Sequence, residues 1–294
     1  VAIDGNTAVV VEVNSETDFV AKNAIFQEFV QAVADKALTV DTEKAGDGED
    51  VVSILDMKAD LDDKILKIGE KISIRRFEKV TADVVASYIH GGGRIGVLVA
   101  GNGASDDAAK EALTNIAMQI AAMNPQYISR DEISADELAK MKEITIDSAL
   151  NDPFSLPKPV LSKLIEKAVA GVWSAEDVAI YEEKKSNMNF LPNFLSKEAK
   201  AQLAEIACAD KEEISGNKIF SGLVEGRISK QMKEICLLDQ VYVKAEDGKQ
   251  TVAAYLKSVN PALKIAKFVR FEVGEGMEKK NEDFAAEVAK QMNV

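Results

Sequence analysis

The order β-branched strand, short turn, amphipathic helix occurs repeatedly along the chain, and it constrains the fold more than any other feature. Residues 7–13 form a strand-length β-branched run, and apolar residues then recur at roughly helical spacing over 19–37. Residues 94–100 lead through a Gly-Asn-Gly turn into a second such helix over 106–123. The repetition predicts related units of mixed helix and sheet.

A third copy lies at the C-terminus, where a strand over 266–273 leads through two glycines to Asp283-Phe284. Three copies without a fixed period do not indicate a solenoid. We therefore expect an α+β fold with two related α/β sandwich-like subdomains and antiparallel sheets. Between the copies, the sequence predicts a helix over 51–66 and strands over 71–79 and 83–89.

The strand signal vanishes between residues 151 and 215. Prolines open this segment, and amphipathic helices follow at about 160–170, 175–186 and 196–208. We expect an inserted helical module of a coiled-coil or dimerisation type, with Trp173, Phe190 and Phe194 in its small core. The predicted domains are an N-terminal core subdomain, a C-terminal core subdomain in two pieces and the insert: 1–93, 94–150 with 216–294, and 151–215.

Composition limits the classes of partner. The 294 residues exceed a typical single domain, and 36 basic against 49 acidic residues give a net charge of −13, which argues against direct nucleic-acid binding. The chain has no apolar run long enough to span a membrane and no signal peptide at its start. We expect a cytoplasmic protein without a membrane partner.

Enzyme motifs are incomplete. His90-Gly91-Gly92-Gly93 has the letters of a lipase oxyanion loop, but the chain has no Gly-x-Ser-x-Gly elbow and no second histidine. Gly91, Gly93 and Gly96 fit a dinucleotide-binding spacing, yet a strand follows them where a helix is required. A hairpin turn accounts for these glycines better. We predict no catalytic residue, no cofactor and no metal site.

The stretch from Asn14 to Lys22 stands where the first strand gives way to a helix. Thr17 or Asp18 suits the N-cap, because its side-chain oxygen can accept an unpaired amide of the first turn. In one interpretation Asp18 caps the helix and Phe19 staples it to the sheet. In the other, Phe19 is presented to a partner.

This stretch resembles the signature of the elongation factor Ts family, the nucleotide exchange factors for elongation factor Tu. Four further blocks resemble that family in the same order: 68–76, 87–99, 224–227 and 268–276. The resemblance implies that the chain is no enzyme but promotes GDP release from elongation factor Tu in translation elongation. The alternative is a non-catalytic interaction or chaperone-like scaffold protein.

The resemblance also implies a contact surface. The acid and phenylalanine that match Asp18 and Phe19, flanked by Thr17 and Val20, press against the partner's GTPase domain near its phosphate and Mg²⁺ site. Ile68 and Gly69 match an adjacent contact, although a strand-entry turn with a core isoleucine remains an alternative. His90 matches a histidine near the domain contact, and a turn histidine bonded to backbone is the alternative.

A second contact is implied in the other half of the chain. It comprises Val224, Arg227 and Ile228 on one helix and Asp283 with Phe284 at the start of the last helix. Packing and capping remain the alternative for Val224 and Phe284.

Members of the family carry a small helical docking domain ahead of the first strand. This chain opens with Val1 and without an initiating Met, so the resemblance implies a truncated chain that lacks that domain. A homodimer through residues 151–215 is a further prediction, and the alternatives are a second partner or packing of the segment on itself.

Overall fold

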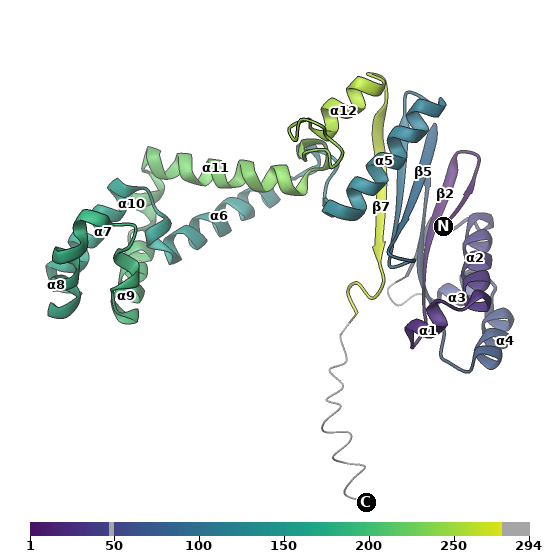
Figure 1. Ribbon diagram of the computed structural model, residues 1–294, viewed down its shortest axis with the longest axis horizontal. Coiled ribbons are helices and arrows are strands. Elements are labelled where there is room, and N and C mark those ends of the chain that lie inside the picture. The colour runs from purple at the N-terminus through teal and green to yellow at the C-terminus, as the bar shows by residue number, and fades with distance from the viewer. Residues whose placement is uncertain (47–49, 278–294) are drawn as a thin grey trace, which may run out of the picture. The chain divides into compact units, whose positions relative to one another are not determined.

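The computed structural model describes residues 1–46 and 50–277 (Figure 1). The described residues divide into two compact units, one formed by Val1–Asn124 with residues 242–277, the other by Pro125–Val241. Each unit has its own hydrophobic core.

The first unit contains two antiparallel sheets, with strand orders β1-β2-β4-β3 and β5-β6-β7. This confirms the predicted α+β class. The strands are β1 (Ala2–Asp4), β2 (Thr7–Asn14), β3 (Lys44–Ala45), β4 (Ser73–Thr81), β5 (Val84–His90), β6 (Ile95–Asn102) and β7 (Lys264–Glu272). The helices are α1 (Asp18–Ala21), α2 (Ala24–Thr39), α3 (Val51–Ile54), α4 (Lys58–Ile68), α5 (Asp107–Met123) and α12 (Val252–Val259).

The two sheets pack face to face through small and β-branched side chains. Val10 and Val80 of the first sheet lie in one buried cluster with Leu98 and Phe271 of the second. Helices α2 and α3 cover the outer face of the first sheet, α4 packs on α2, and α5 covers the outer face of the second sheet, as Figure 1 shows. Alternation along each strand therefore fills a core on both faces of the sheets.

The glycines after His90 form the predicted hairpin turn between β5 and β6. Gly91, Gly92 and Gly93 all have positive φ, which a residue with a side chain rarely adopts. This turn pairs β5 with β6, so the chain passes from the first sheet to the second between Thr81 and Val84. The division into subdomains stays a prediction.

Two helices expected as continuous are each interrupted. The helix expected over 19–37 breaks at Asn23, whose extended backbone and Oδ1 cap a new helix through the amide of Ile25 at 2.8 Å. The helix expected over 51–66 breaks at Asp56, whose φ of 50° is left-handed. In both places one residue suited to a turn overrides the apolar periodicity.

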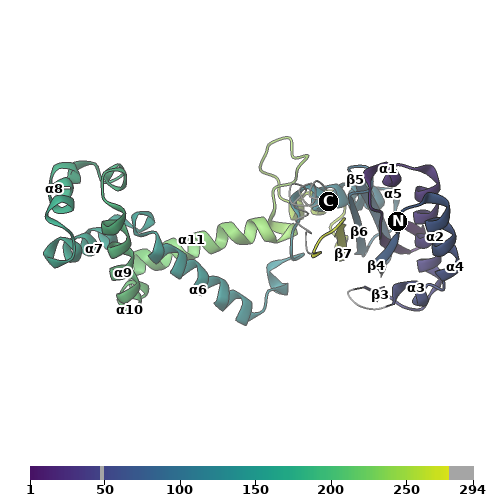
Figure 2. The ribbon, with the colours of Figure 1, turned by 90° about the horizontal axis from the view of Figure 1, so that it is seen from below.

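The second unit is helical in its described elements, and α6 lies beside α11 (Figure 2). Ser134 and Glu137 form a reciprocal capping box at the start of α6. The helices are α6 (Ala135–Asn151), α7 (Lys158–Gly171), α8 (Ala175–Lys184), α9 (Lys197–Ala209), α10 (Lys211–Ser215) and α11 (Lys218–Ile235). Short 3-10 helices occupy Arg130–Glu132, Pro153–Ser155, Lys185–Asn187, Leu191–Asn193 and Leu237–Asp239.

The core predicted for residues 151–215 is partly wrong. Trp173 is buried, and its indole N–H donates to the carbonyl of Ala199 at 2.9 Å. Phe190 and Phe194, however, are 58% and 51% exposed. Leu191, the first residue of the 3-10 helix Leu191–Asn193, and Leu195 just after that helix lie in the core instead.

The unit extends beyond that segment, because α6 and α11 share its hydrophobic core. Residues 151–215 as a separate inserted module therefore stay a prediction. Among the described residues, no helix has the length and apolar character needed to cross a bilayer.

Gly96 tests the packing between the sheets. A Cβ at this position would lie 2.9 Å from Val10 Cγ2 and 3.4 Å from Ile89 Cδ1. We expect Gly96→Ala to lower the free energy of unfolding by about 1–3 kcal/mol, because the valine side chain is stiff and the space is filled.

Urea unfolding measures this, with Gly222→Ala in α11 as the control. A Cβ there meets no atom within 4 Å, so that variant gains helix propensity of up to about 1 kcal/mol. Equal stability of Gly96→Ala and the wild type would show that the sheets are loosely packed.

Candidate functional site

One end of the double sheet gathers the loops that the sequence singles out in the first unit. Strand β2 ends where β4 begins, with Asn14 opposite Ser73, and β5 ends where β6 begins, with His90 opposite Ile95. Strand β7 ends at the same level of the second sheet. We call this end the loop end; it comprises residues 15–19, 68–71, 90–94 and 273–277.

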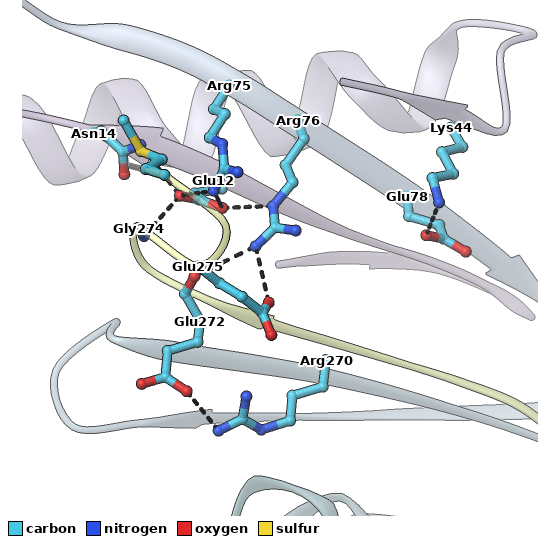
Figure 3. Close-up of polar contacts among 11 residues, drawn as sticks. Glu12, Asn14, Lys44, Arg75, Arg76, Glu78, Arg270, Glu272, Gly274 and Glu275 are labelled. Carbon is cyan, nitrogen blue, oxygen red and sulfur yellow. Dashed lines mark hydrogen bonds and ion pairs between the residues drawn. The ribbon is translucent and has the colours of Figure 1, made fainter. Parts of the chain in front are cut away.

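The buried carboxylate of Glu12 joins the two sheets at the loop end (Figure 3). Its two oxygens each accept from Arg75 Nη1 at 3.0 Å, and Oε2 also accepts from Arg76 Nε at 2.5 Å. Oε1 accepts from the backbone N–H of Gly274, which follows β7, at 3.0 Å. One side chain of β2 therefore binds its neighbour β4 and the turn of the opposite sheet.

Arg76 extends this network. Its Nη2 donates to the carbonyl of Glu272 and pairs with Glu275, both at 3.3 Å. Its guanidinium also lies 4.1 Å from the centre of the Phe271 ring, a favourable cation–π contact.

The electrostatics of Glu12 are set by two opposing effects. Burial by itself raises the pKa of this carboxyl, because a charge is costly away from water. The hydrogen bonds that it accepts act in the opposite direction and leave the pKa of Glu12 below its ordinary value of 4.5. The carboxylate is thus charged at neutral pH and serves as structure, fully bonded within the protein.

Helix α1 presents Phe19 to solvent. The side chain of Phe19 is 82% exposed, whereas the next residue, Val20, is 8% exposed and lies in the core. The N-cap is Thr17, whose Oγ1 accepts from the amide of Val20 at 3.4 Å. The stapling interpretation of Phe19 is therefore wrong, and Asp18 is not the cap.

Asp18 itself is exposed and pairs with Lys22 one turn later, at 3.0 Å. The hydrogen bond and the charge of that ammonium hold the pKa of Asp18 below its ordinary value. Asp18 is thus an exposed anion beside an exposed aromatic ring.

Two pairs of residues tie the loop before α1 to the turn after α4. Thr17 donates its backbone N–H and its hydroxyl to the two oxygens of Glu70, at 3.1 and 2.8 Å. In return, the amide of Lys71 donates to Glu16 Oε2 at 3.4 Å. Segments 53 to 55 residues apart in the sequence are held together in this way.

Ile68 and Gly69 lie at the end of α4 and not in a strand-entry turn. Gly69 is the left-handed C-cap with φ 81°, and its N–H donates to the carbonyl of Ile65. Ile68 is half-buried against the core. Leu66, in the same last turn, is 84% exposed, a residue that sequence reasoning missed.

His90 lies exposed at the last position of β5. Its Nδ1 is 3.1 Å from the hydroxyl of Tyr88, and its carbonyl accepts from the amide of Arg94 across the hairpin. The backbone of His90 is thus bonded within the turn, as the alternative of a turn histidine predicts, while its imidazole ring remains exposed.

The residues of the second predicted contact differ in how exposed they are. Val224 is 1% exposed and belongs to the helical core, so packing accounts for it. Arg227 and Ile228 are half-buried on α11, and Arg227 Nη2 donates to Ser155 Oγ at 2.9 Å. Asp283 and Phe284 lie outside the described residues.

Sequence reasoning also missed Glu12 and Glu70. An isolated glutamate in a strand or a turn carries no pattern that names its partners. The only signal was that Glu70 directly follows Ile68-Gly69 in a block already singled out. Within residues 1–46 and 50–277, no three His, Cys, Asp or Glu side chains are grouped as metal ligands.

The chain is similar to known proteins of one family. A family model described as "Elongation factor TS" matches residues 16–275. The elongation factor Ts of Clostridioides difficile (strain 630) is 39% identical over 295 residues, covering 98% of this chain and 77% of the relative. That of Clostridium novyi (strain NT) is 35% identical over 305 residues, covering 99% and 78%.

The fold, the exposed loop and these matches define a translation factor of the nucleotide-exchange class. The chain belongs to the elongation factor Ts family, whose role is guanine nucleotide exchange on elongation factor Tu during translation elongation.

Glu12 yields a prediction for stability and pH. We expect Glu12→Gln to lower the free energy of unfolding by about 3 kcal/mol at pH 7, because the two largely buried guanidinium groups that Glu12 bonds lose its negative charge. Since the pKa of Glu12 is lower in the folded protein, its contribution is full above pH 4.5 and is lost as pH falls through the folded pKa.

Urea unfolding at pH 7 and pH 3.5 tests this. The difference between wild type and variant is expected to shrink at the lower pH. The exposed control Glu28→Gln, on α2, should stay within about 0.5 kcal/mol of wild type. A difference that is unchanged at low pH would contradict an ionic role for Glu12.

Proposed function

We propose that Phe19, with Asp18 beside it, is the element that promotes GDP release, by inserting into the GTPase domain of elongation factor Tu near the site of the phosphate and Mg²⁺. The observation that carries this proposal is the 82% exposure of the Phe19 side chain at the loop end. An aromatic ring left in water by its own fold is suited to a pocket on a partner.

The proposed action requires no covalent step in this chain. A ring that enters beneath the phosphate site displaces Mg²⁺ and its coordinating water, and a bound cation is often the largest local charge in such a site. Burying a phenylalanine contributes about 1.5–3 kcal/mol. That corresponds to about 10–100-fold weaker nucleotide binding if all of it opposes the nucleotide.

Neighbouring residues widen the proposed contact. Thr17, Ile68 and Gly69 lie on the two tied segments, and His90 lies on the hairpin of the second sheet. Val20 is buried in the core and supports the contact by holding α1 in place. Gly69 leaves its backbone open to close approach, because nothing within 4 Å would meet a Cβ there. We include the exposed Leu66 as a further apolar contact.

In the helical unit we retain Arg227 and Ile228 as a second contact, and we omit the buried Val224. The strongly negative charge supports a protein partner over a nucleic acid. A cytoplasmic location without a membrane partner follows from this role and stays part of the proposal.

The test is GDP release from elongation factor Tu loaded with a fluorescent GDP. We expect wild-type protein to accelerate release and Phe19→Ala to lose about 10–100-fold of that acceleration. Its free energy of unfolding should change by less than about 0.5 kcal/mol, because the side chain is exposed.

The control is Ile144→Ala, which removes an exposed apolar side chain of α6 outside the loop end and should leave release unchanged. Equal release with Phe19→Ala and wild type would remove Phe19 from the mechanism. Binding without acceleration by wild type would favour the scaffold alternative.

We further propose a homodimer through the helical unit, as the sequence led us to expect. Phe190 and Phe194 support this, because they expose two aromatic rings four residues apart, with Lys184 Nζ 4.9 Å from the centre of the Phe194 ring.

Sedimentation equilibrium tests the dimer. We expect wild type to sediment as a dimer at micromolar concentration and Phe190→Ser/Phe194→Ser as a monomer. Deleting residues 151–215 is a poorer test, since it removes much of the core that α6 and α11 share. A monomeric wild type would refute the proposal.

A further inference from the structure

We infer that Glu70 is a positioning residue for Phe19: its carboxylate holds the loop before α1 against the end of α4, so that Phe19 is presented in one orientation. The inference rests on the proposed function and adds a residue to it.

Helix α1 cannot hold its own shape. It has four residues, far fewer than an isolated helix needs in water. Its C-terminal end is bonded to α2 through Asn23 and Gln27, but its N-terminal end depends on the N-cap Thr17, whose capping bond from the Val20 amide is long, at 3.4 Å. The direction of Phe19 therefore depends on what fixes Thr17.

Glu70 fixes Thr17 at two atoms. A carboxylate has no proton to give, so the hydroxyl of Thr17 must donate to it, and this leaves the Oγ1 lone pairs facing the Val20 amide. The Thr17 backbone N–H donates to the second oxygen. Bonds to a charged acceptor are stronger than neutral ones, and the hydroxyl that donates here becomes the better cap.

The bonds between residues 16–17 and residues 70–71 form a clamp, which includes a second, reciprocal bond. Glu16 accepts the amide of Lys71 while Glu70 accepts the amide of Thr17, so each segment donates backbone to a side chain of the other. The left-handed Gly69 reverses the chain just before Glu70. One carboxylate thus couples the segment carrying Phe19 to the segment carrying Ile68 and Gly69.

Such coupling affects exchange through preorganisation. A loop that is ordered only on binding loses affinity to conformational entropy, and a loop already held does not. Glu70 is half-buried and lies outside the hydrophobic clusters, so its loss should leave the fold intact.

The experiment measures GDP release from elongation factor Tu with Glu70→Ala, Glu70→Gln, Phe19→Ala and the double variant Glu70→Ala/Phe19→Ala. We expect Glu70→Ala to need about tenfold more protein for half-maximal acceleration. Glu70→Gln should retain most of the activity, because a carboxamide can accept from the Thr17 N–H and donate to its Oγ1.

The double variant separates positioning from general damage. If Glu70 acts through Phe19, its removal has little further effect once Phe19 is alanine, so the two losses are not additive. Full additivity would overturn the inference. The inference would also be overturned if Glu70→Ala accelerated GDP release as well as the wild type does. In that case the proposed function of Phe19 would still stand.

Hydrogen exchange reports on the clamp without the partner. The Thr17 and Lys71 amides should exchange slowly in wild type and at least tenfold faster in Glu70→Ala, with α2 amides unchanged as the internal control. Unchanged exchange at Thr17 refutes the clamp. If wild type itself does not accelerate GDP release, the proposed function fails and the positioning role fails with it.

Discussion

The buried charge of Glu12 is the constraint on which the loop end depends. A carboxylate taken out of water is unfavourable unless its oxygens are bonded, and the partners it requires come from β4 and from the turn after β7. Hydrophobic packing between the sheets has no direction of its own. The ionic network supplies direction, because its bonds form only when the ends of both sheets are in register.

Because the ionic network holds the two sheets in register, the loop end can expose apolar side chains without loss of the fold. Phe19 contributes little to folding while it remains in water, so the short segment that carries it needs other anchors. Those anchors are the buried Val20, the Thr17 cap and the Glu70 carboxylate, which comes from a segment 53 residues further along the chain. The core of the unit therefore holds the fold, and the loop end is left with side chains that a partner can bury.

Sequence periodicity predicted the strands and the hairpin well, because β-branched runs and three consecutive glycines leave few alternatives. It could not predict the orientation of Phe19. In one continuous helix Phe19 would lie two turns before Phe26 and share its buried face. The break at Asn23 turns α1 relative to α2, so Val20 enters the core and Phe19 faces water. The same limit explains why the prediction that Phe190 and Phe194 lie in the core is wrong. The 3-10 helix between them changes the helical periodicity, so Leu191 is buried in place of its neighbour Phe190.

Thermodynamic linkage shows why a small rigid contact suits nucleotide exchange. If this protein lowers the affinity of elongation factor Tu for GDP by some factor, GDP lowers its affinity for elongation factor Tu by the same factor. A contact that bound very tightly would not be released when nucleotide returned. One aromatic anchor is worth about 10–100-fold, which is enough to weaken nucleotide binding and still be reversed by it. If Glu70 preorganises that anchor as we propose, little of this binding energy is lost to ordering the loop, and most of it acts against the nucleotide.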